Sequence, residues 1–152
     1  AGQAVDRVGL MLGLRFPCGK ELEKLAMKSN RKWKVKPVIK NGSCCLSGLE
    51  NQCKKLISDG VSKEDTALYC LKTIEVTIAA MTKEAVLKTG DIPIVYAGGV
   101  MSNKLIRASF EREFGAFFAE PEFSCDNAAG TAVYAAIMNG GMKCGDINNF
   151  TA

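Results

Sequence analysis

The stretch that decides the fold is residues 92–103, with the sequence IPIVYAGGVMSN. It opens with an apolar run of strand length, and the glycine pair Gly98 and Gly99 follows directly. Further on, residues 103–114 carry apolar side chains at helical spacing, and residues 116–119 (AFFA) form a second apolar run. A strand, a helix and a strand in this order predict a parallel pair joined by a crossover helix.

The residues before this stretch predict a mainly helical segment. Ser62 and Asp65 resemble a helix-start box, which opens a long helix to about residue 88 along Leu68, Leu71, Ile74, Ile78 and Met81. Shorter helices are expected over residues 3–13, 21–28 and 46–58, an edge strand over residues 35–39, and a last helix over residues 127–138. We therefore divide the chain into a helical part, residues 1–90, and an α/β lobe, residues 91–152.

The composition is that of an ordinary globular protein. The 152 residues are 47% apolar and 24% charged, enough for one moderate core. No apolar run reaches the roughly 18 residues that cross a bilayer, and the first residues do not form a signal peptide. Seven cysteines without a Cys-x-x-Cys pair predict free buried thiols and no cysteine zinc site. We expect a cytoplasmic protein without membrane contact, or a mitochondrial one if the chain is an organellar homologue.

The positive charge is concentrated in one segment. The net charge is +4, and six lysines and arginines fall between Lys28 and Lys40 around the single tryptophan, Trp33. This mixture suits contact with a phosphate backbone and with a base. The alternative is a solvated loop, because a charge cluster alone shows only electrostatic capacity.

Two turns are candidates for binding chemistry. Gly98 and Gly99 lie between a strand and a helix, where missing Cβ atoms let a ligand reach backbone N–H groups, with Asn103 at the mouth of the site. The alternative is a tight turn capped by Ser102 or Asn103. Asp126 likewise suits either a helix cap or a metal- or phosphate-binding corner.

Asp6 lies on the first predicted helix and Gly19 in a turn. Read alone, Asp6 is a solvent-facing carboxylate.

Six blocks of sequence, taken in order, resemble the tRNA threonylcarbamoyladenosine transferase family, formerly called O-sialoglycoprotein endopeptidase or glycoprotease. The blocks are GQAVDR (2–7), LGLxxPxG (12–19), ELEKLA (21–26), SGL (47–49), AGGVxxN (97–103) and DNAA (126–129).

The resemblance implies a fold and a binding site. The fold is the C-terminal part of an actin-like ATPase architecture, an RNase-H-like α/β lobe preceded by a mainly helical insertion. The residues that the resemblance assigns to nucleotide or threonylcarbamoyl-adenylate binding are Asp6, Gly19, Gly98, Gly99 and Asn103, the glycine pair lying beside the phosphate.

The resemblance also implies a metal. Asp126 matches a ligand of one divalent metal ion, which two histidines of a His-x-x-x-His motif also bind. The implied ion is iron or zinc, with magnesium as an alternative. The chain contains no histidine. We therefore expect a fragment that lacks the N-terminal lobe and is inactive alone, since one ligand does not fix an ion. No catalytic residue is identified in it.

The implied reaction transfers threonylcarbamoyl from its adenylate to the adenosine adjacent to the tRNA anticodon. The implied partners are tRNA and the proteins of the threonylcarbamoyladenosine complex. Two alternatives remain, a non-catalytic assembly lobe of the same family and a glycoprotein metalloprotease. The chain departs from the family pattern at several positions, among them Cys18 in place of a usual glycine and Glu50 in place of a usual lysine.

Overall fold

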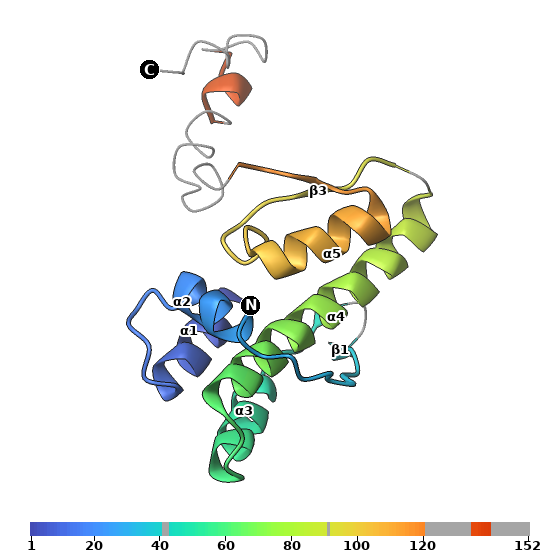
Figure 1. Ribbon diagram of the computed structural model, residues 1–152. Helices are drawn as coiled ribbons and strands as arrows, with labels where there is room; N and C mark the ends of the chain where they lie inside the picture. Colours follow the sequence, from blue (N-terminus) through green and yellow to red (C-terminus); the bar gives the residue numbers. More distant parts are fainter. Residues whose placement is uncertain (41–42, 91, 121–134, 141–152) are drawn as a thin grey trace.

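The computed structural model describes residues 1–40, 43–90, 92–120 and 135–140 (Figure 1). Its helices are α1 (Gly2–Met11), α2 (Gly19–Ala26), α3 (Leu49–Ser58), α4 (Lys63–Thr89) and α5 (Lys104–Phe114), and its strands are β1 (Ile39–Lys40), β2 (Ser43–Cys44), β3 (Val95–Tyr96) and β4 (Phe117–Phe118). The described part is thus mainly helical, with two small two-stranded sheets. None of its helices combines the length and apolar character that a bilayer crossing requires.

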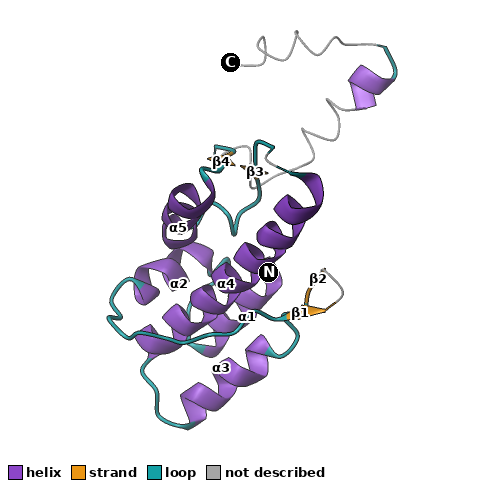
Figure 2. Ribbon diagram, turned by 90° about the vertical axis from the view of Figure 1, so that its right-hand side faces the viewer, coloured by secondary structure: helices purple, strands orange, loops and turns teal. Residues whose placement is uncertain are grey.

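Helix α4 is the spine on which the other helices pack (Figures 1 and 2). It begins as the sequence predicts, because the hydroxyl of Ser62 accepts the backbone N–H of Asp65 at 3.1 Å. It ends at Gly90, whose φ of +79° favours glycine. Helices α1, α2 and α3 pack along its N-terminal part, and the prediction of a long helix over these residues is confirmed.

The core lies between these helices. Val8, Leu22, Ile74, Ile106 and Phe110 are completely buried and belong to one apolar cluster. They come from α1, α2, α4 and α5, so α1 and α5, about 100 residues apart in the chain, share a single core.

The buried face of α4 differs from the predicted stripe. Leu71 and Ile74 are buried as expected, but Leu68, Ile78 and Met81 are only half-buried. Threonines take their place inside the protein. Each hydroxyl donates to the carbonyl four residues before it, so its burial leaves no unpaired polar group. These residues are Thr66, Thr73, Thr77 and Thr82.

The predicted strand–helix–strand unit is confirmed. Strands β3 and β4 pair in parallel, with Val95 opposite Phe117 and Tyr96 opposite Phe118, and α5 makes the crossover. The strands are shorter than predicted, and β3 begins at Val95 instead of residue 92. Pro93 has no N–H to donate to a ladder, which is consistent with a late start.

Three other boundaries were predicted less well. Residues 35–38 lie outside the strand, which contains only Ile39 and Lys40 and pairs with Ser43 and Cys44, although the Val38 carbonyl also accepts the N–H of Cys45. Helix α2 begins at Gly19, earlier than expected, and α3 begins at Leu49, later than expected, after a turn at residues 47 and 48. The predicted helix over residues 127–138 lies largely outside the described residues, of which 135–138 are helical.

Candidate functional site

Asp6 holds the turn that leads into α2. Its Oδ1 accepts the backbone N–H of Cys18 at 2.9 Å, and the residue is half-buried. The reading of Asp6 as a simple solvent-facing carboxylate is therefore wrong. The turn also lies close to α1, because a Cβ added to Gly9 would be 2.2 Å from the Cβ of Cys18. Asp6 and the glycine at position 9 together fix where Gly19 begins the helix.

Gly19 faces open space at this helix start. A Cβ added there would meet no atom within 4 Å, and the residue is half-buried. Its neighbour Cys18 is completely buried. Burial, followed by the negative charges of Asp6 and Glu21, raises the pKa of the Cys18 thiol, so this sulfur stays protonated and neutral.

The Gly98 and Gly99 turn presents unused backbone donors. Gly98 has a φ of +106°, and its carbonyl accepts the N–H groups of Met101 and Ser102. Within the described part of the chain, the N–H groups of Gly98, Gly99 and Val100 have no protein acceptor. A Cβ added to either glycine would meet nothing within 4 Å. The turn can therefore donate hydrogen bonds to an anion that approaches its backbone.

Asn103 is the N-cap of α5, as one of the two sequence readings proposed. Its Oδ1 accepts the N–H groups of Leu105 at 3.1 Å and Ile106 at 3.2 Å, and the residue is buried. The side-chain NH₂ group has no acceptor among the described residues. The cap uses only the oxygen of the amide, so the nitrogen remains a donor for a ligand.

Glu23 of α2 joins these two regions. Its Oε1 accepts the backbone N–H of Lys104 at 2.7 Å, next to the Asn103 cap. Consequently the first three amides of α5 are paired with protein groups, and the helix terminus itself is not open to an anion. Sequence reasoning missed Glu23, because nothing in the pattern of α2 separates it from an ordinary surface carboxylate.

The structure thus connects the predicted residues through α2. Asp6 sets the start of this helix at Gly19, and Glu23, one turn further along, holds the N-terminus of α5 beside Asn103. Asp126 lies outside the described residues, and the described residues contain no group of three His, Cys, Asp or Glu side chains placed to hold a metal.

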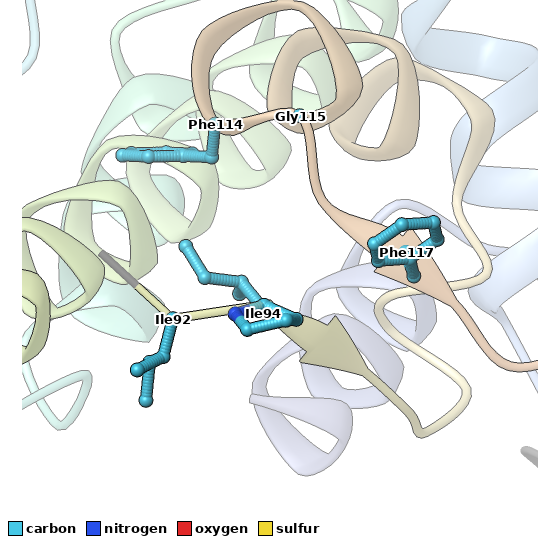
Figure 3. Close-up of a pocket in the computed structure, with 6 residues that line it drawn as sticks. Ile92, Ile94, Phe114, Gly115 and Phe117 are labelled. Atoms are coloured by element: carbon cyan, nitrogen blue, oxygen red, sulfur yellow. The ribbon is translucent and has the colours of Figure 1, made fainter.

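Two cavities lie away from this arrangement. One, of about 370 Å³, is lined by Met11, Lys54, Ile57 and Ser58. The other, of about 290 Å³, lies between the strand β3 region and the end of α5, where Ile92, Ile94, Phe114 and Phe117 line it (Figure 3). Neither cavity is lined by a residue that the resemblance assigns to binding.

Comparison with known proteins assigns the family. The family model described as tRNA N6-adenosine threonylcarbamoyltransferase matches residues 1–133. The chain belongs to this family. A tRNA N6-adenosine threonylcarbamoyltransferase of Neorickettsia sennetsu is 34% identical over 150 residues, which cover 90% of this chain and 45% of the relative. Another, from Archaeoglobus fulgidus, is 28% identical over 142 residues, covering 90% of this chain and 44% of the relative. The chain therefore spans a little under half the length of these threonylcarbamoyltransferases.

Proposed function

We propose that this chain is the C-terminal part of a tRNA-modifying enzyme. The enzyme transfers threonylcarbamoyl from threonylcarbamoyl-adenylate to the exocyclic amine of the adenosine adjacent to the anticodon. Family membership supports the reaction. The observation that carries the site is the linkage of Asp6, Gly19 and Asn103 through helix α2, with Glu23 as the connecting residue.

In this proposal the adenylate is bound mainly by backbone groups. The N–H groups of Gly98, Gly99 and Val100, which have no acceptor among the described residues, donate to the phosphate, and the NH₂ group of Asn103 donates to the nucleotide. The open space beside Gly19 receives the nucleoside, while Asp6 keeps the turn before it in place. Fixed donors of this kind contribute to catalysis by orienting the reacting carbonyl.

The complete enzyme needs a second half. A two-lobed actin-like architecture is proposed, in which this chain supplies the helical insertion and the RNase-H-like lobe. Asp126 would supply one ligand to a divalent metal, with histidines from the other lobe, and the ion would stabilise charge developing on the acyl group. This chain alone is proposed to be inactive, and tRNA, the adenylate and the proteins of the modification complex are its proposed partners.

The test uses the protein completed to the length of its relatives. Gly99→Ala adds a Cβ where the phosphate is expected, and no protein atom lies within 4 Å of it. We expect a fall in kcat/KM for threonylcarbamoyladenosine formation on the order of 10-fold to 100-fold, mostly through KM for the adenylate. Gly48→Ala is the matched control, because its Cβ also meets open space and its backbone is in the right-handed helical region.

The readouts separate the alternatives. Modified nucleoside in tRNA is measured by mass spectrometry, and peptide cleavage of a sialoglycoprotein is measured in parallel. Equal activity of the Gly99→Ala and Gly48→Ala proteins would overturn the proposed site. A complete protein that makes neither product but still binds its family partners would favour the assembly lobe, and cleavage without tRNA modification would favour the metalloprotease.

A further inference from the structure

Residues 28–40, here called the basic strap, run from the turn that ends α2 across helix α4 into strand β1 (Figures 1 and 2). Its first end is fixed by Asp65. Ser29 Oγ donates to Asp65 Oδ1 at 2.6 Å, Arg31 lies 3.4 Å from Oδ2, and Trp33 Nε1 donates to the Asp65 carbonyl at 3.0 Å. One acidic residue at the start of α4 therefore engages three residues of the strap.

The other end of the strap is fixed as well. The backbone N–H of Val38 donates to Thr77 Oγ1 at 3.2 Å, and the Val38 carbonyl accepts the N–H of Cys45 at 2.8 Å. Asp65 and Thr77 are separated by about 18 Å along α4 at 1.5 Å per residue. The strap is thus held at both ends of a defined length of helix.

Between these anchors the side chains alternate, as in an extended chain. Trp33 and Val35 are half-buried against the protein, whereas Lys32, Lys34 and Lys36 are exposed. Successive exposed lysines are separated by two residues, about 6.6 Å of extended backbone, which is close to the spacing of phosphates along one nucleic-acid strand.

The charge of the strap is not neutralised. Its sequence contains no acidic residue, and the only ion pair that it forms within the described part of the chain is between Arg31 and Asp65. The lysines without an acidic partner there are Lys28, Lys32, Lys34, Lys36 and Lys40. A row of fixed, unpaired cations attracts a polyanion more strongly than a single small anion.

Trp33 does not serve as a platform for a base. The Arg31 guanidinium covers its ring at 4.1 Å from the centroid, and Tyr69 packs edge-on with a centroid separation of 5.0 Å. Its Nε1 is paired with Asp65. The tryptophan therefore anchors the strap from within, and the exposed cations of the strap that have no acidic partner among the described residues are lysine ammonium groups.

We infer that the basic strap binds the phosphate backbone of RNA, without reading bases, and that Asp65 is the residue that positions it. The inference rests on the proposed function only for the identity of the RNA as tRNA. Because the strap is held at both ends, binding costs little conformational entropy. Its contribution to affinity comes from counterion release, so it depends steeply on salt.

The first test is neutralisation of the outward row in the completed protein. We expect Lys32→Gln/Lys34→Gln/Lys36→Gln to weaken binding of a tRNA transcript roughly 50-fold at near-physiological salt and to lower the slope of log K against log salt by about 2. The matched control is Lys54→Gln/Lys55→Gln/Lys88→Gln, which removes the same charge from exposed lysines elsewhere. Equal effects of both triple changes would overturn the inference, since net charge alone would then explain them.

The second test separates two effects of Asp65 on RNA binding: its contacts with the strap and its negative charge. Removing an acid should strengthen RNA binding if charge alone matters, and Glu64→Ala, one residue before Asp65, measures that effect. We expect Asp65→Ala to weaken binding several-fold instead, because the strap loses its carboxylate contacts. Equal or tighter binding by Asp65→Ala than by Glu64→Ala would contradict the positioning role.

The outcomes also distinguish this inference from the proposed function. If tRNA binding depends on the strap but the completed protein forms no threonylcarbamoyladenosine, the proposed function is refuted and the inference about the strap is supported. Full modification activity with a neutralised strap and unchanged tRNA affinity would do the reverse. Loss of binding to anionic lipid vesicles with unchanged RNA binding would show that the strap faces a membrane surface and would overturn the inference.

Discussion

The carboxylate of Glu23 accepts the backbone N–H of Lys104 at 2.7 Å, although the two residues are 81 positions apart. This hydrogen bond places an acid at the positive end of the α5 dipole and completes the pairing begun by Asn103. It joins α2, in the helical part of the chain, to the first residue of α5, the crossover helix between β3 and β4. Glu23 thus helps to set the relative position of the two candidate binding segments, together with the apolar core that α1, α2, α4 and α5 share.

Glu23→Ala should destabilise the protein by about 1 kcal/mol, because a charged hydrogen bond at a helix N-terminus is lost. Glu23→Gln keeps an acceptor oxygen and should lower the free energy of unfolding by less than Glu23→Ala does. Chemical denaturation measures both changes. An alanine variant as stable as the wild type would mean that the amide of Lys104 finds an equally good acceptor in water.

Asn103→Ala should cost about 1 to 2 kcal/mol, because the N–H groups of Leu105 and Ile106 lose their cap. Asn103→Ser keeps an oxygen at the cap but lacks the amide nitrogen. We expect the serine variant to retain near-normal stability and to lose affinity for the adenylate in the completed protein. Calorimetric titration beside denaturation tests this, and parallel losses of stability and affinity in both variants would show that Asn103 acts only as a cap.

Gly9→Ala should destabilise the protein by about 2 to 3 kcal/mol, since its Cβ would overlap Cys18. The added carbon would be 2.2 Å from the Cβ and 2.7 Å from the sulfur of Cys18. Cys18→Gly removes both atoms and should rescue the variant, whereas Cys18→Ala keeps the Cβ and should not. A double-mutant cycle on the free energy of unfolding checks the coupling, and additive effects of Gly9→Ala and Cys18→Gly would refute it.

The described cysteines should fall into two reactivity classes. The hydrogen bond with Ser47 lowers the pKa of Cys45 from its usual value of 9.0. At a pH below 9.0 this half-exposed thiol should therefore be alkylated faster than Cys44. Burial should protect the thiols of Cys18, Cys53 and Cys70, the last with its pKa raised by its hydrogen bond to Cys53 and by burial. Peptide mapping after iodoacetamide measures the order, and Ser47→Ala should slow Cys45 specifically.

Tyr96 should make stability depend on alkaline pH. Burial raises its pKa above the usual 10.0; the hydrogen bond with Thr82 opposes this shift, and the charge of Glu113 adds to it. A raised pKa in the folded state gives a contribution that is complete below pH 10 and is lost as the pH rises through the folded pKa. The unfolding free energy of wild type relative to Tyr96→Phe, followed from about pH 9 to about pH 11, should fall. A constant difference would show that the phenol ionises equally in both states.

Local signals in the sequence predicted local structure well. The Ser62 and Asp65 start box and the Asn103 cap were predicted, because each depends on residues close together in the chain. The parallel strand pair was predicted from the order of a strand, a helix and a strand. Strand ends were predicted poorly. A β-ladder ends where its partner ends, and partners such as Val95 and Phe117 lie far apart in the sequence.

The candidate site was predicted in part. The sequence singled out Asn103 and the glycine turn, and the structure shows a helix cap there and N–H groups without an acceptor in the described part of the chain. It could not identify Glu23 or the Asp65 anchor, because a carboxylate on an exposed helix face has no local mark of its distant partner. The substitution of Glu50 for a usual lysine gains a local partner, since Arg7 pairs with it at 2.8 Å between α1 and α3.

The threonines on the inner face of α4 need no polar partner from α1, α2 or α3, although Thr77 and Thr82 also bond Val38 and Tyr96 outside these helices. Since each hydroxyl is satisfied by a carbonyl of the same helix, the surfaces of α1, α2 and α3 need offer only shape and not matching donors or acceptors. An apolar side chain of α1, α2 or α3 can therefore be replaced by another apolar side chain without leaving a buried threonine hydroxyl of α4 without a hydrogen bond.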